Sequence, residues 1–226
     1  MKTKNKLVLA IIIITIIFIN KVDLRGKLNY NNESYTQEEK ISDENSNLLL
    51  VNKSNPISED YKPNKLVKPK VQFLKDTKDE SRYMDEVAAN ALEELFKCAK
   101  KEGIILIGSS AYRSYESQVK IYNENVLEKG IDYANKYVAI PGKSEHQTGL
   151  SIDVTNKSRA FGKTSIEAQW LANNAHRFGF ILRYPEGKED VTGYNYEPWH
   201  IRYVGKEPAL KIFTDNITLE EYMRMI

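Results

Sequence analysis

The chain has very little cysteine and histidine and almost no net charge. Its 226 residues include one cysteine, Cys98, which excludes an intrachain disulfide framework and any metal site built on several cysteines. Lysines and arginines number 33 and acidic residues 31, so the net charge is +2 and we expect no nucleic-acid partner. The three histidines are His146, His176 and His200, so any metal site must combine them with carboxylates.

The N-terminus has the pattern of an export signal. Three lysines within the first six residues precede an apolar run, 7–19, whose single polar residue is Thr15. A helix of this length spans roughly 20 Å, which is shorter than the ~30 Å core of a bilayer. A basic start and a short apolar run are typical of a secretory signal, although no small-residue cleavage site follows. We predict that residues 1–22 are a signal-like segment or a short membrane anchor.

The next stretch is too polar to fold alone. Residues 29–47 contain one aliphatic side chain, Ile41, and cannot bury enough apolar surface to offset the entropy of folding. We therefore predict a polar linker over 23–47 and a single folded domain over 48–226, without internal repeats and monomeric. This domain is expected outside the cytoplasm, either secreted or attached to the membrane through a retained N-terminal segment.

Periodicity and capping residues predict the elements of the domain. Apolar residues at three- and four-residue spacing over 84–99 predict an amphipathic helix that Gly103 ends. Ser114 is expected to begin a helix, and Thr218 opens a last one with a capping-box pattern. Further helices are expected at 132–138 and 166–178, and strands at 48–52, 104–107, 149–155, 180–183 and 199–204. Because the strands cluster late without regular alternation with helices, we predict an α+β fold with a small antiparallel sheet and flanking helices.

Two of the histidines lie in motif-like surroundings. Residues 144–153 read SEHQTGLSID and residues 197–200 read EPWH. Asp153 lies between Ile152 and Val154 in a predicted strand, where a carboxylate is costly to bury unless it is paired or binds a metal. His146, Asp153 and His200 together make a two-histidine, one-carboxylate set, which is typical of catalytic zinc sites that keep a fourth position for water.

Glu197 completes a minimal set for hydrolysis. It lies three residues before His200, close enough to reach a water molecule at the metal. A general base beside a metal-activated water is sufficient chemistry for amide hydrolysis. Each spacing alone is common by chance, and each histidine taken singly is more simply a hydrogen-bonded structural residue. The combination, with glycine and serine at fixed offsets, is much more specific.

A third block strengthens the pattern. Residues 110–118 read SAYRSYESQ, similar to an S-x-Y-R-S-x-x-x-Q block, while SEHQTGLSID matches S-x-H-x-x-G-x-[AS]-x-D and EPWH matches E-x-W-H. With residues 48–67, these blocks resemble the D-alanyl-D-alanine carboxypeptidases of the VanY type, peptidase family M15. The resemblance covers 48–204 in the family's order. Ala111 stands where many relatives have glycine, a mild departure that changes no assigned role.

The resemblance implies a zinc-peptidase fold of the D-Ala-D-Ala carboxypeptidase and hedgehog type, and it assigns roles to particular residues. It implies Zn²⁺ held by His146, Asp153 and His200, with Glu197 as general base and proton shuttle. It also implies that Arg113 stabilises the oxyanion and that Ser144 and Gln118 hold the substrate's terminal carboxylate. The alternatives are a surface ion pair for Arg113, a turn cap for Ser144 and an exposed helical position for Gln118. His176 matches no family ligand and is expected to be a packed or surface residue.

The resemblance implies a zinc carboxypeptidase acting on peptidoglycan stem peptides. The expected reaction removes the C-terminal D-alanine, as a D,D-carboxypeptidase or possibly as an L,D-carboxypeptidase. One alternative is a cell-wall endopeptidase of the same zinc fold. Another is a zinc-binding module without catalysis, as in the distantly similar hedgehog domains. Such a module has no need of a base or an oxyanion donor, whereas Glu197 and Arg113 are both present.

Overall fold

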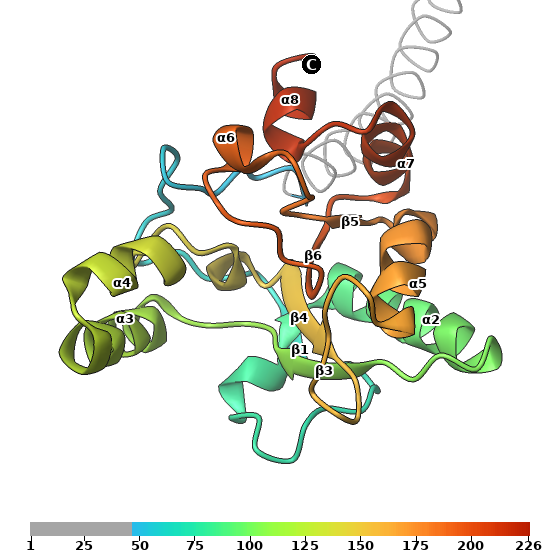
Figure 1. Ribbon diagram of the computed structural model, residues 1–226, viewed down its shortest axis with the longest axis horizontal. Helices are drawn as coiled ribbons and strands as arrows, with labels where there is room; N and C mark the ends of the chain where they lie inside the picture. Colours follow the sequence, from blue (N-terminus) through green and yellow to red (C-terminus); the bar gives the residue numbers. More distant parts are fainter. Residues whose placement is uncertain (1–46) are drawn as a thin grey trace, which may run out of the picture. The chain divides into compact units, whose positions relative to one another are not determined.

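A four-stranded antiparallel sheet lies at the centre of the structure, a computed structural model that describes residues 47–226 (Figure 1). Its strands run in the order β3-β4-β6-β5. Their bounds are β3 (Ile107–Ser110), β4 (Ser151–Thr155), β6 (His200–Tyr203) and β5 (Phe180–Leu182). The predicted segment 1–22 and nearly all of the predicted linker 23–47 lie outside the described residues, so these boundaries stay predictions.

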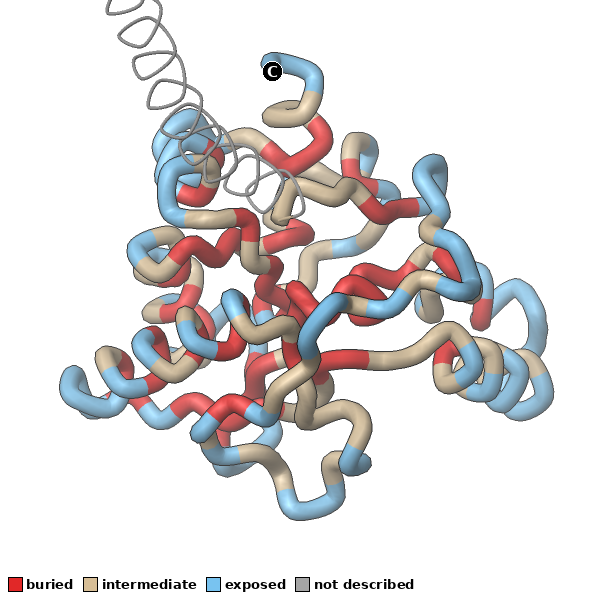
Figure 2. Tube along the Cα trace, turned by 180° about the vertical axis from the view of Figure 1, so that it is seen from behind, coloured by how far each residue is buried: buried red, intermediate tan, exposed pale blue. Residues whose placement is uncertain are grey.

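The main core forms between the sheet and the long helix α2 (Glu86–Lys101). The helix begins at Asp85, whose side chain accepts a hydrogen bond from the backbone N–H of Val87. Its apolar stripe packs with Ile152 and Ile201 from the sheet, both fully buried. A short hairpin of β1 (Leu66–Val67) and β2 (Met84–Asp85) precedes the helix. Buried segments accordingly gather along the strands and the inner faces of the helices (Figure 2).

Two further groups of helices flank the sheet. The helices α3 (Tyr115–Lys129) and α4 (Ile131–Tyr137) pack on each other and stand out to one side (Figure 1). The C-terminal part contains α6 (Glu189–Thr192), α7 (Lys206–Asp215) and α8 (Leu219–Met223), and the last two share a second apolar cluster with β5. The helix α5 (Ile166–Asn174) lies near α2 and continues into the 3₁₀ turn η3 (Ala175–Phe178).

Most predicted elements are confirmed. The helices begin where capping residues indicated: the Ser114 side chain caps α3, and Thr218 forms a capping box with Glu221 at α8. The fold is α+β with small antiparallel sheets, as expected. The helix expected at 166–178 is also present, although its last turn tightens to η3 before Gly179 ends it in the left-handed region. Among the described residues, no helix is long and apolar enough to span a membrane.

Two local predictions were wrong or incomplete. The strand expected at 48–52 does not form, because the Asn52 side chain accepts hydrogen bonds from the backbone N–H groups of Ser54 and Asn55 and folds the chain into a turn. The strand expected at 104–107 begins only at its end, because the N–H of Ile104 still bonds to the helix carbonyl of Ala99. The helix α7 was not anticipated.

Candidate active site

The register of the sheet aligns three polar residues from three strands. Asp153 on β4 lies directly opposite His200 on β6 and opposite Ser110 on β3. Residues directly opposite each other in an antiparallel pair share a face, so their side chains meet. The Nδ1 atom of His200 consequently lies 3.0 Å from Oδ1 of Asp153. Strand pairing therefore brings together residues that are 47 positions apart in the sequence.

His146 reaches the same point from the buried 3₁₀ turn η2 (Glu145–Thr148). Gly149 ends this turn with a φ of +70°, and a Cβ there would lie 3.0 Å from the backbone nitrogen of Asp85. Glycine is thus required for the chain to turn from η2 into β4. The ring is fixed as well, because Nδ1 of His146 lies 2.7 Å from the carbonyl oxygen of Ala111. That contact uses the Nδ1 proton and leaves Nε2 as a free ligand atom.

The three residues fit a zinc ion. One ligand atom from each of His146, Asp153 and His200 lies within 4.8 Å of the others. Nε2 of His146 is 3.5 Å from Oδ2 of Asp153. Ligand atoms on a tetrahedral zinc, at bonds of about 2.0–2.1 Å, lie roughly 3.3 Å apart, which is close to this separation. Two neutral imidazoles and one carboxylate are also a normal donor set for catalytic zinc.

Arg113 lies beside this cluster, and two side chains hold its guanidinium in place. Its guanidinium donates to Oε1 of Gln118 at 2.7 Å and to Oγ of Ser110 at 3.2 Å. Gln118 in turn donates to the carbonyl of Ala139 at 2.6 Å and is almost fully buried. Gln118 is therefore placed to orient Arg113 and, among the described residues, is not one of those that line the cleft.

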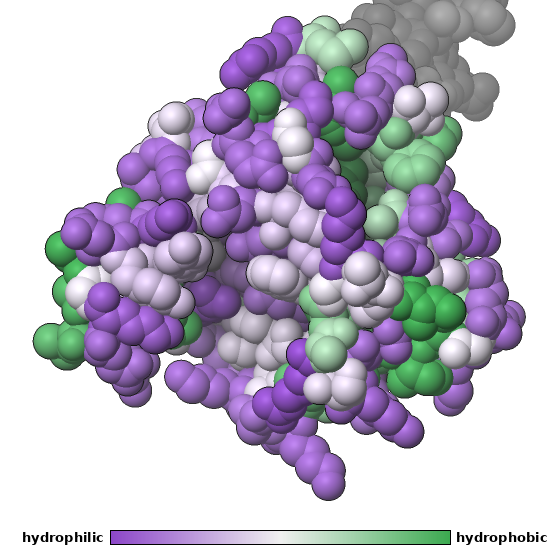
Figure 3. All heavy atoms as spheres, viewed as in Figure 1, coloured by the Kyte–Doolittle hydropathy of each residue, from purple (hydrophilic) through white to green (hydrophobic). Residues whose placement is uncertain are grey.

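A cleft of about 280 Å³ opens over the cluster, between the sheet and the α3–α4 pair (Figure 3). Arg113, Glu197 and the three metal-binding residues all contribute to its wall. Ser144 also lines it, and within residues 47–226 its hydroxyl makes no capping hydrogen bond to η2. The remaining wall is formed by aromatic and aliphatic side chains, namely Ile121, Tyr137, Val138, Ala139, Tyr184, Tyr194 and Trp199, together with Glu145.

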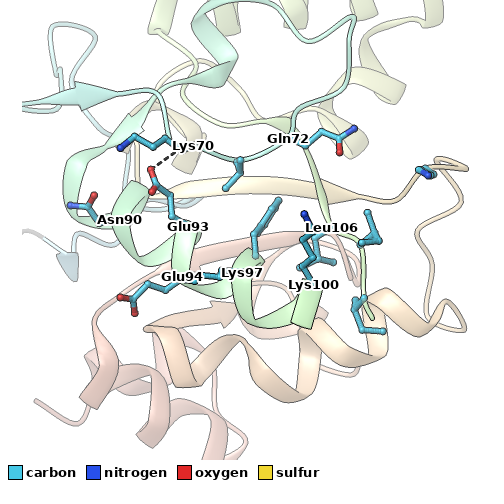
Figure 4. Close-up of a pocket in the computed structure, with 13 residues that line it drawn as sticks. Lys70, Gln72, Asn90, Glu93, Glu94, Lys97, Lys100 and Leu106 are labelled. Atoms are coloured by element: carbon cyan, nitrogen blue, oxygen red, sulfur yellow. Dashed lines mark hydrogen bonds between the residues drawn. The ribbon is translucent and has the colours of Figure 1, made fainter. Parts of the chain in front are cut away.

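A larger cavity, of about 860 Å³, lies along α2 and has a different character (Figure 4). Asn90, Glu93, Lys97 and Lys100 project from the helix along its edge, and Glu93 accepts a hydrogen bond from the backbone N–H of Lys70. No histidine is among the described residues that line it. Within residues 47–226, the cluster that could hold a metal lines the smaller cleft, which is therefore the better candidate for an active site.

Comparison with known proteins identifies the family. A family model described as VanY, D-alanyl-D-alanine carboxypeptidase, matches residues 81–206. The D-alanyl-D-alanine carboxypeptidase of Enterococcus faecalis is 37% identical over 197 residues, which cover 83% of this chain and 69% of that protein. This chain belongs to the VanY family of D-alanyl-D-alanine carboxypeptidases. It is therefore an enzyme, a metallo-carboxypeptidase, and its resemblance to that family is confirmed.

Solved structures of VanY-family proteins share the fold. The LdcB LD-carboxypeptidase is 44% identical, with a TM-score of 0.74 over 79% of this chain and 86% of that chain. A variant of the vancomycin-resistance D,D-pentapeptidase VanY, in complex with Zn(II), is 38% identical, with a TM-score of 0.65 over 79% of this chain and 99% of that chain. The zinc-peptidase fold and the zinc cofactor predicted from the sequence are both supported by these relatives.

Burial and charge set the protonation states of this VanY-family site. Burial raises the pKa of the Glu197 carboxyl to about 7, in the range where a group can both accept and return a proton near neutral pH. Burial, with the nearby Arg113 charge, lowers the pKa of His146 to about 3 and keeps this ligand neutral. Although burial opposes it, the two histidines lower the pKa of Asp153 to about 2 and keep it ionised. His146 and Asp153 are therefore in the state that zinc requires. Although burial opposes it, the carboxylates of Asp153 and Glu145 raise the pKa of His200 to about 9, so this ring must release a proton when it binds the metal.

Sequence reasoning missed the buried support beneath the site. Glu145 is inaccessible to solvent, and its Oε1 accepts hydrogen bonds from Arg183 at 2.7 Å and from Arg202 at 2.8 Å. Although burial opposes it, these two guanidiniums hold the pKa of Glu145 below its usual range. Asp153 is singled out in the sequence because it is a charged residue between apolar neighbours in a predicted strand. Arg202 lies between Ile201 and Tyr203 and shows the same pattern.

The remaining histidine behaves as expected. His176 stacks on Phe213 with ring centroids 3.8 Å apart, and it is not part of the metal-binding cluster. The prediction that it is a packed or surface residue is confirmed. Tyr184, by contrast, was not anticipated: its buried ring lies 5.0 Å from that of His200 and forms part of the cleft wall.

Proposed function

We propose that this protein hydrolyses the C-terminal D-alanine from peptidoglycan stem peptides, as a D,D-carboxypeptidase of the cell wall. The single observation that carries this proposal is the meeting of Glu197, Arg113 and the three-residue metal cluster in one small cleft. A non-catalytic zinc module has no need to retain a partly buried base and a guanidinium beside the metal. The expected place of action is outside the cytoplasm, where this substrate lies.

His146, Asp153 and His200 would hold the zinc ion. When bound, zinc supplies Lewis acidity that activates water and polarises the scissile carbonyl. Glu197 takes the proton from the attacking water and then delivers it to the leaving amino group of D-alanine. Its carboxylate Oε2 lies 4.0 Å from Nδ1 of His200, so it faces the cluster without completing it.

Arg113 is the proposed electrostatic partner of the developing oxyanion. The contacts with Gln118 and Ser110 hold its guanidinium before substrate arrives. A donor that is already oriented needs no reorganisation in the transition state, and one such donor is worth about 3–4 kcal/mol. Gln118 thus contributes to substrate recognition through Arg113. Ser144 lines the cleft with a hydroxyl available to the terminal carboxylate.

A second candidate activity is favoured by one comparison. The LdcB LD-carboxypeptidase is more similar to this chain than the VanY structure is, in both identity and TM-score. An L,D-carboxypeptidase removes the D-alanine that ends a tetrapeptide, with the same metal, base and oxyanion donor. The difference between the two activities lies in the residue on the other side of the scissile bond.

Product analysis separates these activities. Stem pentapeptide, stem tetrapeptide and a cross-linked stem peptide are offered to the zinc-loaded protein, and the products are measured by mass spectrometry. The D,D-activity predicts loss of one alanine from the pentapeptide with the tetrapeptide left intact. Loss of alanine from the tetrapeptide alone supports the L,D-activity instead. Cleavage at an internal bond of a cross-linked peptide, with neither free peptide trimmed, would identify an endopeptidase.

Recognition of the free carboxylate gives a further prediction. Amidation of the substrate's C-terminus should lower kcat/KM about 10-fold or more. The protein donors that bind the free carboxylate lose a charge-assisted hydrogen bond when the carboxylate is replaced by an amide. A tenfold change corresponds to ~1.4 kcal/mol. Ser144→Ala should reduce this discrimination while zinc stays bound. Ser158→Ala, in a loop where the hydroxyl bonds to Asn156, is the matched control and should retain full discrimination. Equal cleavage of acid and amide by the wild-type protein would contradict carboxylate recognition.

A further inference from the structure

Beneath the metal cluster lies a buried ionic network with no net charge. Two carboxylates, Glu145 and Glu220, are paired with two guanidiniums, Arg183 and Arg202, and none of the four is more than 5% exposed. Arg183 donates to Oε1 of Glu145 and also makes a two-pronged contact with Glu220, at 2.9 and 2.6 Å. Glu220 lies on α8, outside the residues that the family model matches.

The second oxygen of Glu145 is not used by this network. Oε1 accepts from both arginines, whereas Oε2 is buried and has no hydrogen-bond partner within residues 47–226. Nε2 of His200 is likewise buried and without a hydrogen-bond partner in the described chain. These two atoms face each other at 3.6 Å. A buried donor and a buried acceptor that lack other partners are costly to leave apart.

We propose that Glu145 is a positioning residue that fixes which nitrogen of His200 binds the metal. Its Oε2 receives the Nε2 proton of His200, which places the ring's lone pair on Nδ1. Nδ1 is the nitrogen that faces the cleft, 3.0 Å from Oδ1 of Asp153. Arg183 and Arg202 keep the carboxylate in place by occupying Oε1. This proposal rests on the zinc site of the proposed function.

The variant Glu145→Gln tests this directly. Both arginines can only donate, so the amide oxygen of the glutamine must face them and its NH₂ group must face Nε2. A donor in that position favours the tautomer that carries its proton on Nδ1, the nitrogen that zinc needs. We expect the dissociation constant for zinc to rise about 10–100-fold, as is usual when a group that orients a metal ligand is lost.

Glu220→Gln is the matched control. It removes the same charge from the same network, but Glu220 is hydrogen-bonded to Arg183 and Asn52, and within residues 47–226 no hydrogen bond or ion pair joins it to His200. Both variants are expected to lower the unfolding temperature of the metal-free protein. Only Glu145→Gln should lower the affinity for zinc, measured by competition with a chelator, and change the visible spectrum of the cobalt-substituted protein. If zinc binding is weakened equally in the two variants, Glu145 has only a structural role and the proposal is overturned.

Glu145→Asp covers the case in which the glutamine variant does not fold. It retains a charged partner for the arginines but shortens the side chain by one methylene, which withdraws the second oxygen from His200. Its zinc affinity should fall several-fold, and an unchanged affinity overturns the proposal. A wild-type protein that binds zinc but cleaves no stem peptide would overturn the proposed function and leave this inference intact. The two failures are therefore distinguishable.

Discussion

Replacing Glu197 with glutamine should leave the fold and the zinc in place and lower kcat about 10²–10⁴-fold, the usual cost of losing a general base. The carboxyl lies in the cleft wall and faces His200 at 4.0 Å, and it is not one of the three residues that could hold the metal, so it is placed to reach a water molecule there. Glutamine has the same shape but accepts no proton from water. Because Glu197 is also the proposed acid for the leaving amine, both halves of the reaction are affected.

The measurement is steady-state hydrolysis of stem peptide together with zinc content. Glu186→Gln is the matched control: it lies in the same connection between β5 and β6, in an exposed ion pair with Lys163, and should retain full activity. Near wild-type turnover by Glu197→Gln would remove this residue from the mechanism. Wild-type kcat/KM should fall as the pH drops through the pKa of Glu197. Burial raises this pKa to about 7, and the charge of bound zinc lowers it again, so the acid limb should lie between 4.5 and 7.

Replacing His200 with alanine should abolish stable zinc binding. Structural zinc sites with four protein ligands bind the ion with about 10–16 kcal/mol, or about 2.5–4 kcal/mol per ligand, so the loss of one ligand should lower the affinity about 10²–10³-fold. His200 is almost fully buried between Asp153 and Glu145, so its removal leaves the cluster with two of its three ligands. Activity should fall to background at zinc concentrations that saturate the wild-type protein.

His176→Ala provides the internal comparison for this loss. It removes a histidine of the same chain that stacks on Phe213 and is not part of the metal cluster. Elemental analysis after dialysis should find one zinc per chain in wild type and in His176→Ala, and none in His200→Ala. Stoichiometric zinc in the His200 variant, or hydrolysis that is indifferent to a chelator in the wild type, would contradict the assigned ligand set.

Much of the site could be predicted from the sequence because its signals are local. The spacing of His146 and Asp153, the period-two pattern of the strand and the Glu197–His200 motif each lie within a stretch of ten residues or fewer. The helices were predictable for the same reason, since the apolar stripe of α2 and the caps at Ser114 and Thr218 depend on neighbouring residues. Chemistry that depends on residue type and short spacing can therefore be predicted from the sequence.

The orientation of each side chain in the cluster, and hence the atom that it presents to a metal, follows from contacts between distant segments. The register of β4 against β6 places Asp153 opposite His200, and the carbonyl of Ala111 selects Nε2 of His146 as its free nitrogen. Gln118 accepts a hydrogen bond from Arg113, and Glu145 accepts hydrogen bonds from two arginines that are 38 and 57 residues away. Buried ion pairs between distant segments cannot be predicted from residue spacing. Which residues pair depends on how the segments pack and on the free-energy cost of leaving a buried charge unpaired. The zinc cofactor and the reaction class were predictable from short motifs, whereas the orientation of each side chain in the cluster depends on the packing of distant segments.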